Sequence, residues 1–421
     1  MSHTAEIIAV GTELLLGNIV NTNAQEISQA LSAVGVNVFW HTVVGDNPQR
    51  LAEALDIARS RADVILTTGG LGPTYDDLTK QTICETFGRK LVLHEDILES
   101  LRVFFQKNVH MTMPSNNIQQ AMLPEGCTVF DNPVGTAPGC AFEEGGVHVL
   151  MLPGPPFEMR TMLKGHVLPY LRQLSDEVIV SHDIMTFGLG ESPMEERMRE
   201  KMSRMENPSL ATYAKPSEVR LRATAKARSV EEAEALLTPV VAEVTAFLGD
   251  YVYGVDVASL EEVCFRLLRE KGLTLATAES CTGGRVAERI TALTGVSAVY
   301  RGGVVSYWTA VKADVLGVPQ EILDAYGAVS EQTARAMAEG ARRVTGADVA
   351  VSVTGVAGPD PDERGVAVGI GYIGLATPEG TFCRPCDFGK RRRDRIQDLA
   401  STHALDVVRR YLSGLPIELS R

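Results

Sequence analysis

The chain has 421 residues, of which 45% are hydrophobic and 22% charged, and its formal net charge is −13. This length is too great for one ordinary core, so we expect two or three domains. The negative charge argues against a direct nucleic-acid partner, and no apolar run reaches the ~20 residues of a membrane helix. The N-terminus has no secretory pattern and the seven cysteines are scattered, which together predict a cytoplasmic protein.

The first part of the chain alternates short β-branched runs with amphipathic segments, which is the pattern of a parallel α/β layer. We predict strands at 6–10, 36–44, 64–68 and 148–152, and helices at 22–33 and 48–61. The run at 64–68 is apolar and β-branched, as expected of a strand that is buried on both faces. We assign residues 1–175 to this domain.

The pattern changes near residue 177. Alternating strands are predicted at 178–187 and 218–227, followed by helices at 192–205 and 230–247. We expect a small α+β domain at 176–255, with few candidate catalytic groups. A further α/β domain is expected at 256–421. Its strands are predicted at 273–278, 303–307, 349–352 and 366–373, and its helices include 260–270 and 284–293.

Ser280 follows an apolar strand and precedes a glycine-assisted helix start. Such a turn lifts a side chain out of the sheet edge, and Gly283 and Gly284 let a ligand approach the backbone closely. A helix N-terminus also favours an oxyanion or a phosphate. The same residues can be interpreted as a helix cap before a tight turn, so the motif alone leaves both interpretations open.

A nucleophilic serine needs a base, and only one of the eight histidines, His403, lies beyond Asp256. His403 falls in an apolar helix, where we expect it to be packed. Lysine is an alternative base when its ammonium is destabilised. Lys312 is predicted in the first turn of a helix capped by Thr309, where the helix dipole should lower its pKa. Tyr307, just before this helix, could relay a proton or hold the lysine; a solvated lysine and a core tyrosine are the alternative.

Three other features compete for a role. Cys281 is a rival nucleophile, but its side chain must point away from that of Ser280, and no histidine is placed to activate a thiol. Cys383 and Cys386 form a lone CxxC pair, which we interpret as structural. The basic run at 390–395 opens a predicted helix, and we interpret it as a solvated helix face rather than a phosphate or nucleic-acid site.

Four segments of the third domain occur in a recognisable order: Ala278-Glu279-Ser280-Cys281-Thr282-Gly283-Gly284, Gly303-Val304-Val305-Ser306-Tyr307, Lys312, and Thr354-Gly355-Val356-Ala357-Gly358-Pro359-Asp360. Together they resemble the CinA C-terminal domain, a family that hydrolyses nicotinamide mononucleotide to nicotinic acid mononucleotide and ammonia. The resemblance implies Ser280 as nucleophile, Lys312 as base and Tyr307 as its partner, with no cofactor. It also implies a surface lining the nucleotide and oxyanion, formed by Thr282, Gly283, Gly284, Gly355 and Gly358.

Three predicted strand ends converge at the carboxyl edge of the first sheet, where doubly wound folds bind ligands. They carry Gly11-Thr12-Glu13, Gly69-Gly70-Leu71-Gly72 and Pro153-Gly154-Pro155-Pro156. The glycines make room for a backbone-held phosphate, and Asp76 and Asp77 offer oxygen ligands for a divalent cation that bridges it. The sequence has neither a Walker loop nor a dinucleotide fingerprint here. Helix N-capping by the two aspartates is the alternative.

The segments at these strand ends are Ala9-Val10-Gly11-Thr12-Glu13-Leu14, Thr67-Thr68-Gly69-Gly70-Leu71-Gly72-Pro73-Thr74-Tyr75-Asp76-Asp77-Leu78-Thr79 and Leu152-Pro153-Gly154-Pro155-Pro156. They resemble the molybdopterin-binding fold, a three-layer α/β domain, as it occurs in CinA. In that family this domain is associated with metal-dependent hydrolysis of ADP-ribose to AMP and ribose 5-phosphate.

The resemblance implies a divalent metal (Mg, Mn or Co, possibly with potassium) at Asp76 or Asp77. For the substrate it implies Glu13, Gly69, Gly70, Gly72 and Gly154. A contact between Lys80 and a phosphate is left open. The Gly-Gly-Leu-Gly-Pro-Thr run departs from the Gly-Gly-Thr-Gly pattern of molybdopterin enzymes, which argues against cofactor synthesis.

These features predict a bifunctional pyridine-nucleotide salvage hydrolase: a nicotinamide-nucleotide amidase joined to an ADP-ribose pyrophosphatase. One alternative is a nucleotide-binding regulatory protein of competence or the DNA damage response, with one or both sites inactive. Another is a molybdopterin-related adenylyl or molybdenum-insertion activity in the first domain. We expect small nucleotide ligands, no membrane partner and a homodimer, for which the middle domain is a candidate contact region.

Overall fold

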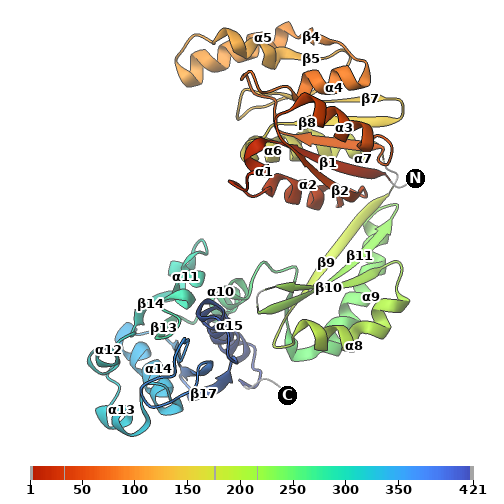
Figure 1. The fold of residues 1–421 in the computed structure, drawn as a ribbon. Coiled ribbons are helices and arrows are strands. Elements are labelled where there is room, and N and C mark those ends of the chain that lie inside the picture. The colour runs from red at the N-terminus through yellow and green to blue at the C-terminus, as the bar shows by residue number, and fades with distance from the viewer. Residues whose placement is uncertain (1–2, 33, 175–176, 216, 418–421) are drawn as a thin grey trace. The chain divides into compact units, whose positions relative to one another are not determined.

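The computed structural model describes residues 3–32, 34–174, 177–215 and 217–417, which fold around three sheets of four or more strands (Figure 1). The predicted helix end at residue 33 and the predicted domain boundary at 175–176 lie outside the described residues. Within the described ranges, none of the helices combines the length and the apolar character needed to span a membrane.

The first sheet has six strands in the order β2-β1-β3-β8-β7-β6. Its strands are β1 (Thr4–Val10), β2 (Asn37–Val44), β3 (Val64–Thr68), β6 (Thr128–Phe130), β7 (Gly139–Glu144) and β8 (Val147–Leu152). The four predicted strands β2, β1, β3 and β8 are parallel, whereas β7 and β6, which were not predicted, are antiparallel. The parallel register brings the carboxyl ends of β1, β3 and β8 to one edge.

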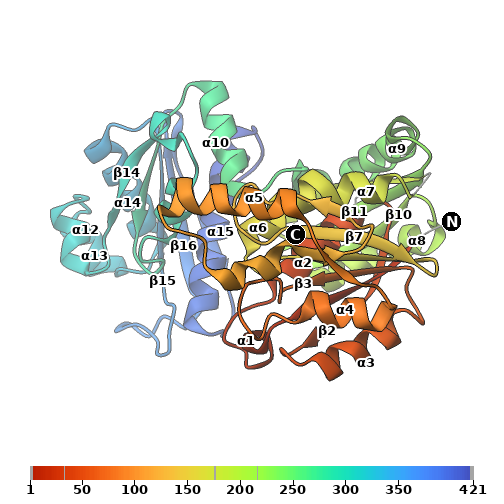
Figure 2. The same ribbon diagram turned by 90° about the horizontal axis from the view of Figure 1, so that it is seen from above.

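Helices cover both faces of this sheet, which makes a three-layer α/β fold as predicted. On β3, Ile65 points into one core, whereas Val64 and Leu66 point into the other. The helices α3 and α4 lie side by side over the first core (Figure 2). The helices are α1 (Thr12–Leu15), α2 (Thr22–Ser32), α3 (Pro48–Ala58), α4 (Thr79–Phe87), α5 (Glu95–Phe104), α6 (Pro156–Met162) and α7 (Leu168–Arg172). A two-stranded sheet, β4 (Leu91–Leu93) with β5 (Met122–Pro124), completes this part.

The middle sheet has the order β10-β11-β9-β12 and is accompanied by two helices, as expected for a small α+β unit. Its elements are β9 (Val178–Phe187), α8 (Glu191–Arg204), β10 (Ser209–Lys215), β11 (Glu218–Ala227), α9 (Val230–Leu248) and β12 (Val252–Val255). The short strands β10 and β12 were not predicted.

The third sheet has the order β14-β13-β15-β16-β17. Its first three strands are parallel and its last two are antiparallel. The strands are β13 (Leu275–Glu279), β14 (Tyr300–Val305), β15 (Val349–Gly355), β16 (Ile370–Thr377) and β17 (Gly380–Asp387). The helices are α10 (Leu260–Lys271), α11 (Arg285–Thr291), α12 (Thr309–Asp314), α13 (Gln320–Tyr326), α14 (Glu331–Thr345) and α15 (Arg393–Leu412).

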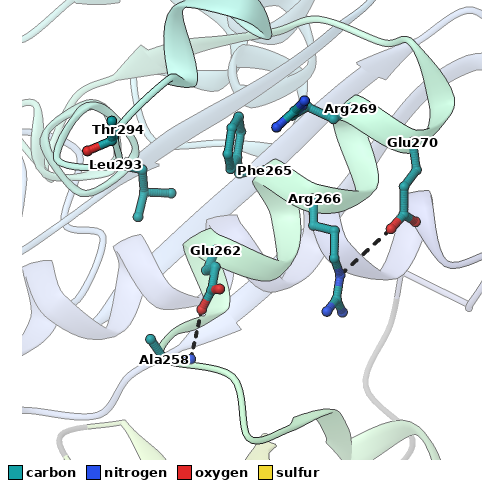
Figure 3. Close-up of a pocket in the computed structure, with 8 residues that line it drawn as sticks. All are labelled: Ala258, Glu262, Phe265, Arg266, Arg269, Glu270, Leu293 and Thr294. Atoms are coloured by element: carbon teal, nitrogen blue, oxygen red, sulfur yellow. Dashed lines mark hydrogen bonds and ion pairs between the residues drawn. The ribbon is translucent and has the colours of Figure 1, made fainter.

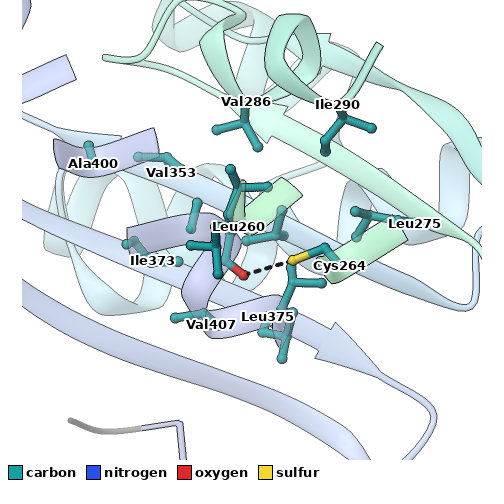
Figure 4. Close-up of a cluster of buried hydrophobic side chains, with 14 of the residues drawn as sticks. Leu260, Cys264, Leu275, Val286, Ile290, Val353, Ile373, Leu375, Ala400 and Val407 are labelled. Carbon is teal, nitrogen blue, oxygen red and sulfur yellow. Dashed lines mark hydrogen bonds between the residues drawn. The ribbon is translucent and has the colours of Figure 1, made fainter. Parts of the chain in front are cut away.

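Two cores fix this sheet between its helices. Side chains of α10, α11 and α15 pack on one face, where Cys264 Sγ donates to the carbonyl of Leu405 at 3.3 Å (Figure 4). Side chains around α14, including Met337, pack on the other face against Ala276 and Ala278 of β13. Alternate residues of β13 therefore hold this strand from both sides, and its carboxyl end is a fixed platform for the residue that follows.

The predicted strand at 366–373 is wrong at its start, because β16 begins at Ile370. Gly369 has a φ of +96° and cannot continue a strand, although Val366 and Val368 are β-branched. The strand β15 continues beyond the predicted end at residue 352 and reaches Gly355.

Candidate active sites

Ser280 stands at the carboxyl end of β13, which lies between two parallel neighbours. Its backbone N–H donates to the carbonyl of Val353 at 2.9 Å, so the last ladder bond of the strand fixes the serine itself. The turn after it runs through two buried residues, Cys281 and Thr282, before α11 begins. The side chain of Ser280 is partly exposed, as a nucleophile that must meet a ligand requires.

Lys312 lies directly beside this serine. Its Nζ is 3.0 Å from Ser280 Oγ and donates to the carbonyl of Ser306 at 2.6 Å. The side chain is only 1% exposed, and this burial lowers the pKa of Lys312 from 10.5 to about 8. The structure therefore brings together a hydroxyl and an amine that can exchange a proton near neutral pH.

The reason we gave for a lowered lysine pKa is wrong. The helix α12 has six residues, Trp308 rather than Thr309 is its N-cap, and Lys312 belongs to its last turn. A helix dipole stabilises a cation in that turn, so it cannot lower the pKa. Removal of the ammonium from water by burial is the first cause of the shift.

Tyr307 is half exposed, and its hydroxyl accepts a hydrogen bond from Arg393 rather than contacting the lysine. The carbonyl of Ser306 holds Lys312 in place of the tyrosine. The guanidinium of Arg393 also donates to the carbonyl of Gly358 at 2.5 Å, so it joins three chain segments at this site. Arg393 is exposed, as our interpretation of the run at 390–395 as a solvated face predicts, but its guanidinium also contacts this site.

The helix N-terminus behind Ser280 is closed to ligands. The carboxylate of Glu279 is buried and accepts hydrogen bonds from the N–H groups of Gly284 (3.0 Å), Val286 (3.0 Å) and Ala287 (2.8 Å). These are the donors that a helix normally offers to an anion. The expected binding of an oxyanion or phosphate by the N-terminus of α11, and by the N–H of Gly284, is therefore wrong.

Thr282 supplies the unpaired polar groups in this turn. Within the described residues, its N–H has no hydrogen-bond acceptor, and its buried Oγ1 also has no partner. Gly283 is exposed, whereas its N–H is used by the carbonyl of Ser280 at 3.0 Å. Of the predicted ligand-lining residues in this turn, Thr282 is the one whose N–H and hydroxyl have no partner among the described residues.

Cys281 is buried in the core, whereas Ser280 is partly exposed, as expected of side chains that point in different directions. A Cβ added to Gly355 would lie 3.3 Å from Cys281 Sγ, so the thiol packs against that glycine in the core. Burial raises the pKa of Cys281 to about 12, which leaves it a thiol at neutral pH. Gly355 therefore supports the core beneath the turn, and Gly358 lies at the site through its carbonyl.

The remaining candidates of this domain are structural. His403 is partly buried and packs against the rings of Phe187 and Phe388, and desolvation lowers its pKa to about 4. Cys383 and Cys386 lie three residues apart on β17, so their side chains point to opposite faces of the strand. We predicted that His403 is packed and that the two cysteines are structural, and the geometry agrees with both predictions.

A cavity of ≈ 410 Å³ lies at the carboxyl edge of the first sheet. The predicted residues Glu13, Gly69, Gly70, Gly72, Asp76, Asp77 and Gly154 all line it. Two further carboxylates that we did not predict, those of Asp46 and Glu158, complete the wall. Among the described residues that line this cavity there are five carboxylates and no lysine, arginine or histidine.

The glycine loop that follows β3 presents free backbone donors to this cavity. Gly69 and Gly70 have φ values of +105° and +68°. A Cβ on Gly69 would lie 2.1 Å from the carbonyl oxygen of Val10, and a Cβ on Gly70 would lie 2.0 Å from Thr79 Oγ1. Only glycine fits these two positions. Within the described residues, the N–H groups of Gly70, Leu71 and Gly72 have no acceptor, as a phosphate-binding loop requires.

The two aspartates do not cap a helix. The helix α4 begins at Thr79 and has no side-chain cap, so the capping alternative is wrong. Asp77 instead accepts hydrogen bonds from the N–H of Thr74 (2.9 Å) and from its hydroxyl, which fixes the loop. Asp76 is exposed and lines the cavity. No group of three or more His, Cys, Asp or Glu in the described ranges is arranged to hold a metal by itself.

Lys80 does not reach the cavity. Its Nζ is buried and donates to the carbonyls of Gln119 (2.8 Å) and Gln120 (3.2 Å). Burial lowers the pKa of Lys80 to about 8. Lys80 therefore holds the backbone of Gln119 and Gln120, and it is not among the described residues that line the cavity.

Another cavity, of ≈ 660 Å³, lies beside α10 and is lined by Phe265, Leu293 and paired charges (Figure 3). Arg266 lies 3.9 Å from Glu270, and Glu262 accepts from the N–H of Ala258 at 2.8 Å. None of the predicted site residues lines it, and Glu262, Arg266 and Glu270 already have partners, so we do not assign it a catalytic role.

Comparison with known proteins assigns the three parts of the chain. The family model for a probable molybdopterin binding domain matches residues 6–173. The damage-inducible protein CinA KH domain matches residues 181–254, and the CinA C-terminal domain matches residues 257–412.

Relatives match over nearly the whole length. A putative competence-damage inducible protein of Acetivibrio thermocellus is 47% identical over 98% of this chain and 99% of its own. A CinA-like protein of Dictyoglomus turgidum is 47% identical over 97% of this chain and 99% of its own. A crystal structure of CinA from Thermoplasma acidophilum, 36% identical, covers 39% of this chain and 95% of its own, with a TM-score of 0.36. The chain belongs to the CinA family of competence- and damage-inducible proteins.

Proposed function

We propose that the C-terminal domain hydrolyses the carboxamide of nicotinamide mononucleotide, giving nicotinic acid mononucleotide and ammonia. The observation that carries this proposal is the 3.0 Å contact between Lys312 Nζ and Ser280 Oγ, together with the pKa of about 8 at the buried lysine. At pH 7 a lysine with this pKa is neutral in about a tenth of the molecules. In those molecules its amine can act as a base towards Ser280.

The chemistry follows from these two groups. Neutral Lys312 takes the proton of Ser280, and Oγ attacks the carboxamide carbon. The N–H and hydroxyl of Thr282 are free to donate to the oxyanion that forms. The lysine then gives its proton to the leaving nitrogen, and ammonia departs from an acyl-serine. Lys312 next takes a proton from water, whose oxygen attacks the ester, and the acid product leaves as Ser280 recovers its proton.

The charged part of the ligand needs a separate partner, and Arg393 is suited to it. Two of its five N–H donors are used by Tyr307 and Gly358, so three remain for a phosphate. Tyr307 then positions the guanidinium rather than the lysine. Because Glu279 already occupies the N-terminus of α11, a phosphate cannot be held by that helix end.

Ammonia release by the full-length protein tests this proposal. We expect the wild-type protein to release ammonia from nicotinamide mononucleotide, and Lys312→Ala to lower the rate by about 10²- to 10⁴-fold, the range of a general base. Cys281→Ala serves as a control, because its thiol faces the core. A wild-type protein that binds the nucleotide without releasing ammonia would favour the regulatory alternative.

For the N-terminal domain we propose metal-dependent hydrolysis of ADP-ribose to AMP and ribose 5-phosphate. Its cavity combines free N–H donors, which suit phosphate oxygens, with five carboxylates, which repel them. A divalent cation resolves this conflict, and the oxygen-only donor set suits Mg²⁺ or Mn²⁺. Asp76, with Asp77 behind it, would hold the ion, which would neutralise charge on the diphosphate. Glu13 is then suited to the ion and not to the phosphates.

The test is AMP formation from ADP-ribose with Mg²⁺, Mn²⁺ or Co²⁺, with and without potassium. We expect no product without a divalent metal and a large loss in Asp77→Asn. Turnover that persists after exhaustive removal of metal would contradict the site. The homodimer and the cytoplasmic location remain predictions from the sequence.

A further inference from the structure

Glu158 differs from the other carboxylates of the N-terminal cavity. It lies in the first turn of α6 and is 9% exposed, whereas Glu13 and Asp76 are exposed. Its Oε2 accepts a hydrogen bond from Asn132 Nδ2 at 2.5 Å. Within the described residues, Oε1 has no hydrogen-bond donor, although the residue lines the cavity. Glu158 therefore presents one fixed, unpartnered oxygen to the ligand space.

The surrounding loop is shaped to admit this carboxylate. A Cβ on Gly135 would lie 2.3 Å from Glu158 Cδ and 2.7 Å from Oε1, so only glycine leaves room for the group. Asn132 is fixed in turn, because its amide also donates to the carbonyl of Ala137 at 2.9 Å. A glutamate on the surface does not need a fixed glycine and a fixed hydrogen-bond donor around it. A carboxylate that must be held in one orientation toward a reacting atom does need them.

The electrostatic setting suits a proton acceptor. Burial raises the pKa of Glu158, and the hydrogen bond from Asn132 opposes this in part. The titratable groups that share its cavity are carboxylates from three other segments: Glu13, Asp46, Asp76 and Asp77. Asp131, in the same loop as Asn132, lines a neighbouring cavity. With no cation on the wall, Glu158 is more basic than an ordinary glutamate.

We propose that Glu158 is the general base of the N-terminal domain and accepts a proton from the water that attacks the diphosphate. The proposal rests on the ADP-ribose hydrolysis proposed above. Glu158 Oε1 takes one proton from water, the water oxygen bonds to a phosphorus atom, and the bridging P–O bond breaks. Its electron pair leaves on the oxygen of the departing monophosphate. The proton on Glu158 then passes to solvent, and one water is consumed for each two monophosphates formed.

The experiment compares Glu158→Gln with wild type in the full chain, by AMP formation across pH and by calorimetric binding of α,β-methylene-ADP-ribose with Mn²⁺. We expect the variant to bind the analogue with unchanged affinity and to lose about 10²- to 10⁴-fold in single-turnover rate. The wild-type rate should rise with pH through the raised pKa of Glu158, and the residual rate of the variant should not.

A second variant reaches the same carboxylate without removing it. Gly135→Ala should displace Glu158 from its socket and lower turnover while the analogue still binds. The matched control is Gly165→Ala, because a Cβ there meets nothing within 4 Å. We expect that control to behave as wild type.

The outcomes separate the two proposals. If wild type makes AMP, and Glu158→Gln keeps its rate and pH profile, the base assignment is wrong and the hydrolysis stands. If Glu158→Gln loses Mn²⁺-dependent binding of the analogue, the residue is a metal ligand and the assignment is wrong. If wild type binds the analogue but makes no AMP from ADP-ribose, the proposed hydrolysis fails, and the base assignment fails with it.

Discussion

The two candidate sites occupy the same kind of position in two different sheets and carry opposite charge. Each follows a central strand between parallel neighbours, β3 in the first sheet and β13 in the third. The first site has five carboxylates and no cation on its wall. The second has a buried lysine beside its serine and an arginine held over it.

The comparison indicates that the end of a central strand determines where each site lies in its domain. The side chains around that strand end determine the charge that the site presents to a ligand. On the functions proposed above, the first site would take its positive charge from a cation in solution, whereas the second has cationic side chains of its own, chiefly Arg393. Four measurements test this contrast.

Removal of the nucleophile should have the largest effect. Because Ser280 Oγ is the hydroxyl next to Lys312, we expect Ser280→Ala to lower ammonia release from nicotinamide mononucleotide by about 10⁴-fold or more. AMP formation from ADP-ribose by the same variant should not change. Full deamidase activity in Ser280→Ala would transfer the role to another group.

Chelation should separate the two sites in the opposite direction. We expect EDTA to bring AMP formation to background, because five carboxylates without a cation repel the diphosphate. Ammonia release should continue at its normal rate. Both products are measured in one sample by chromatography, and added Mg²⁺ or Mn²⁺ should restore AMP alone. Equal loss of both activities would contradict the contrast in charge.

Loss of the arginine should weaken nucleotide binding at the second site. A hydrogen bond to a charged group contributes about 1.5–3 kcal/mol, so we expect Arg393→Ala to raise KM about 10- to 100-fold with a smaller change in kcat. The control is Arg395→Ala, an exposed residue of the same helix. A similar rise in KM for both variants would indicate a general effect of surface charge.

The pH dependence of ammonia release should report the lysine. In the proposed mechanism the neutral form of Lys312 is the base, and burial lowers its pKa to about 8. The rate should therefore rise with pH, about tenfold per unit below this value, and level off above it. A profile that is flat between pH 6 and about 9 would contradict the role of Lys312.

Much of this fold follows from local sequence patterns. The strand at Val64–Thr68 and the strands at Val178–Phe187 and Glu218–Ala227 have the predicted bounds, because their side-chain alternation or continuous burial is visible locally. The strand β17 was missed, because Pro385 and Arg384 interrupt its pattern while Arg384 is buried against Asp406. Such a pairing across the fold leaves no periodic signal.

The sites divide in the same way. Ser280 and Lys312 were predicted, because a glycine turn and a shortage of histidines are countable in the sequence. Arg393 and Glu158 were not, because their partners are remote: Tyr307 lies 86 residues from Arg393, and Asn132 lies 26 residues from Glu158. The role of Glu279 was not predicted. Its position before a helix start does not reveal in the sequence that its carboxylate accepts hydrogen bonds from the first N–H groups of that helix.

The capped start of α11 has a consequence for which ligands the proposed site could be made to accept. Three backbone donors are committed to Glu279 within a few residues of Ser280, so the start of this helix offers no free donors to an anion. On the proposed function, preference for an anionic substrate would then depend on side chains such as Arg393. Substitution of Arg393 should therefore shift the selectivity toward neutral amides. The strand β13, the turn after it and the helix α11 would not need to change.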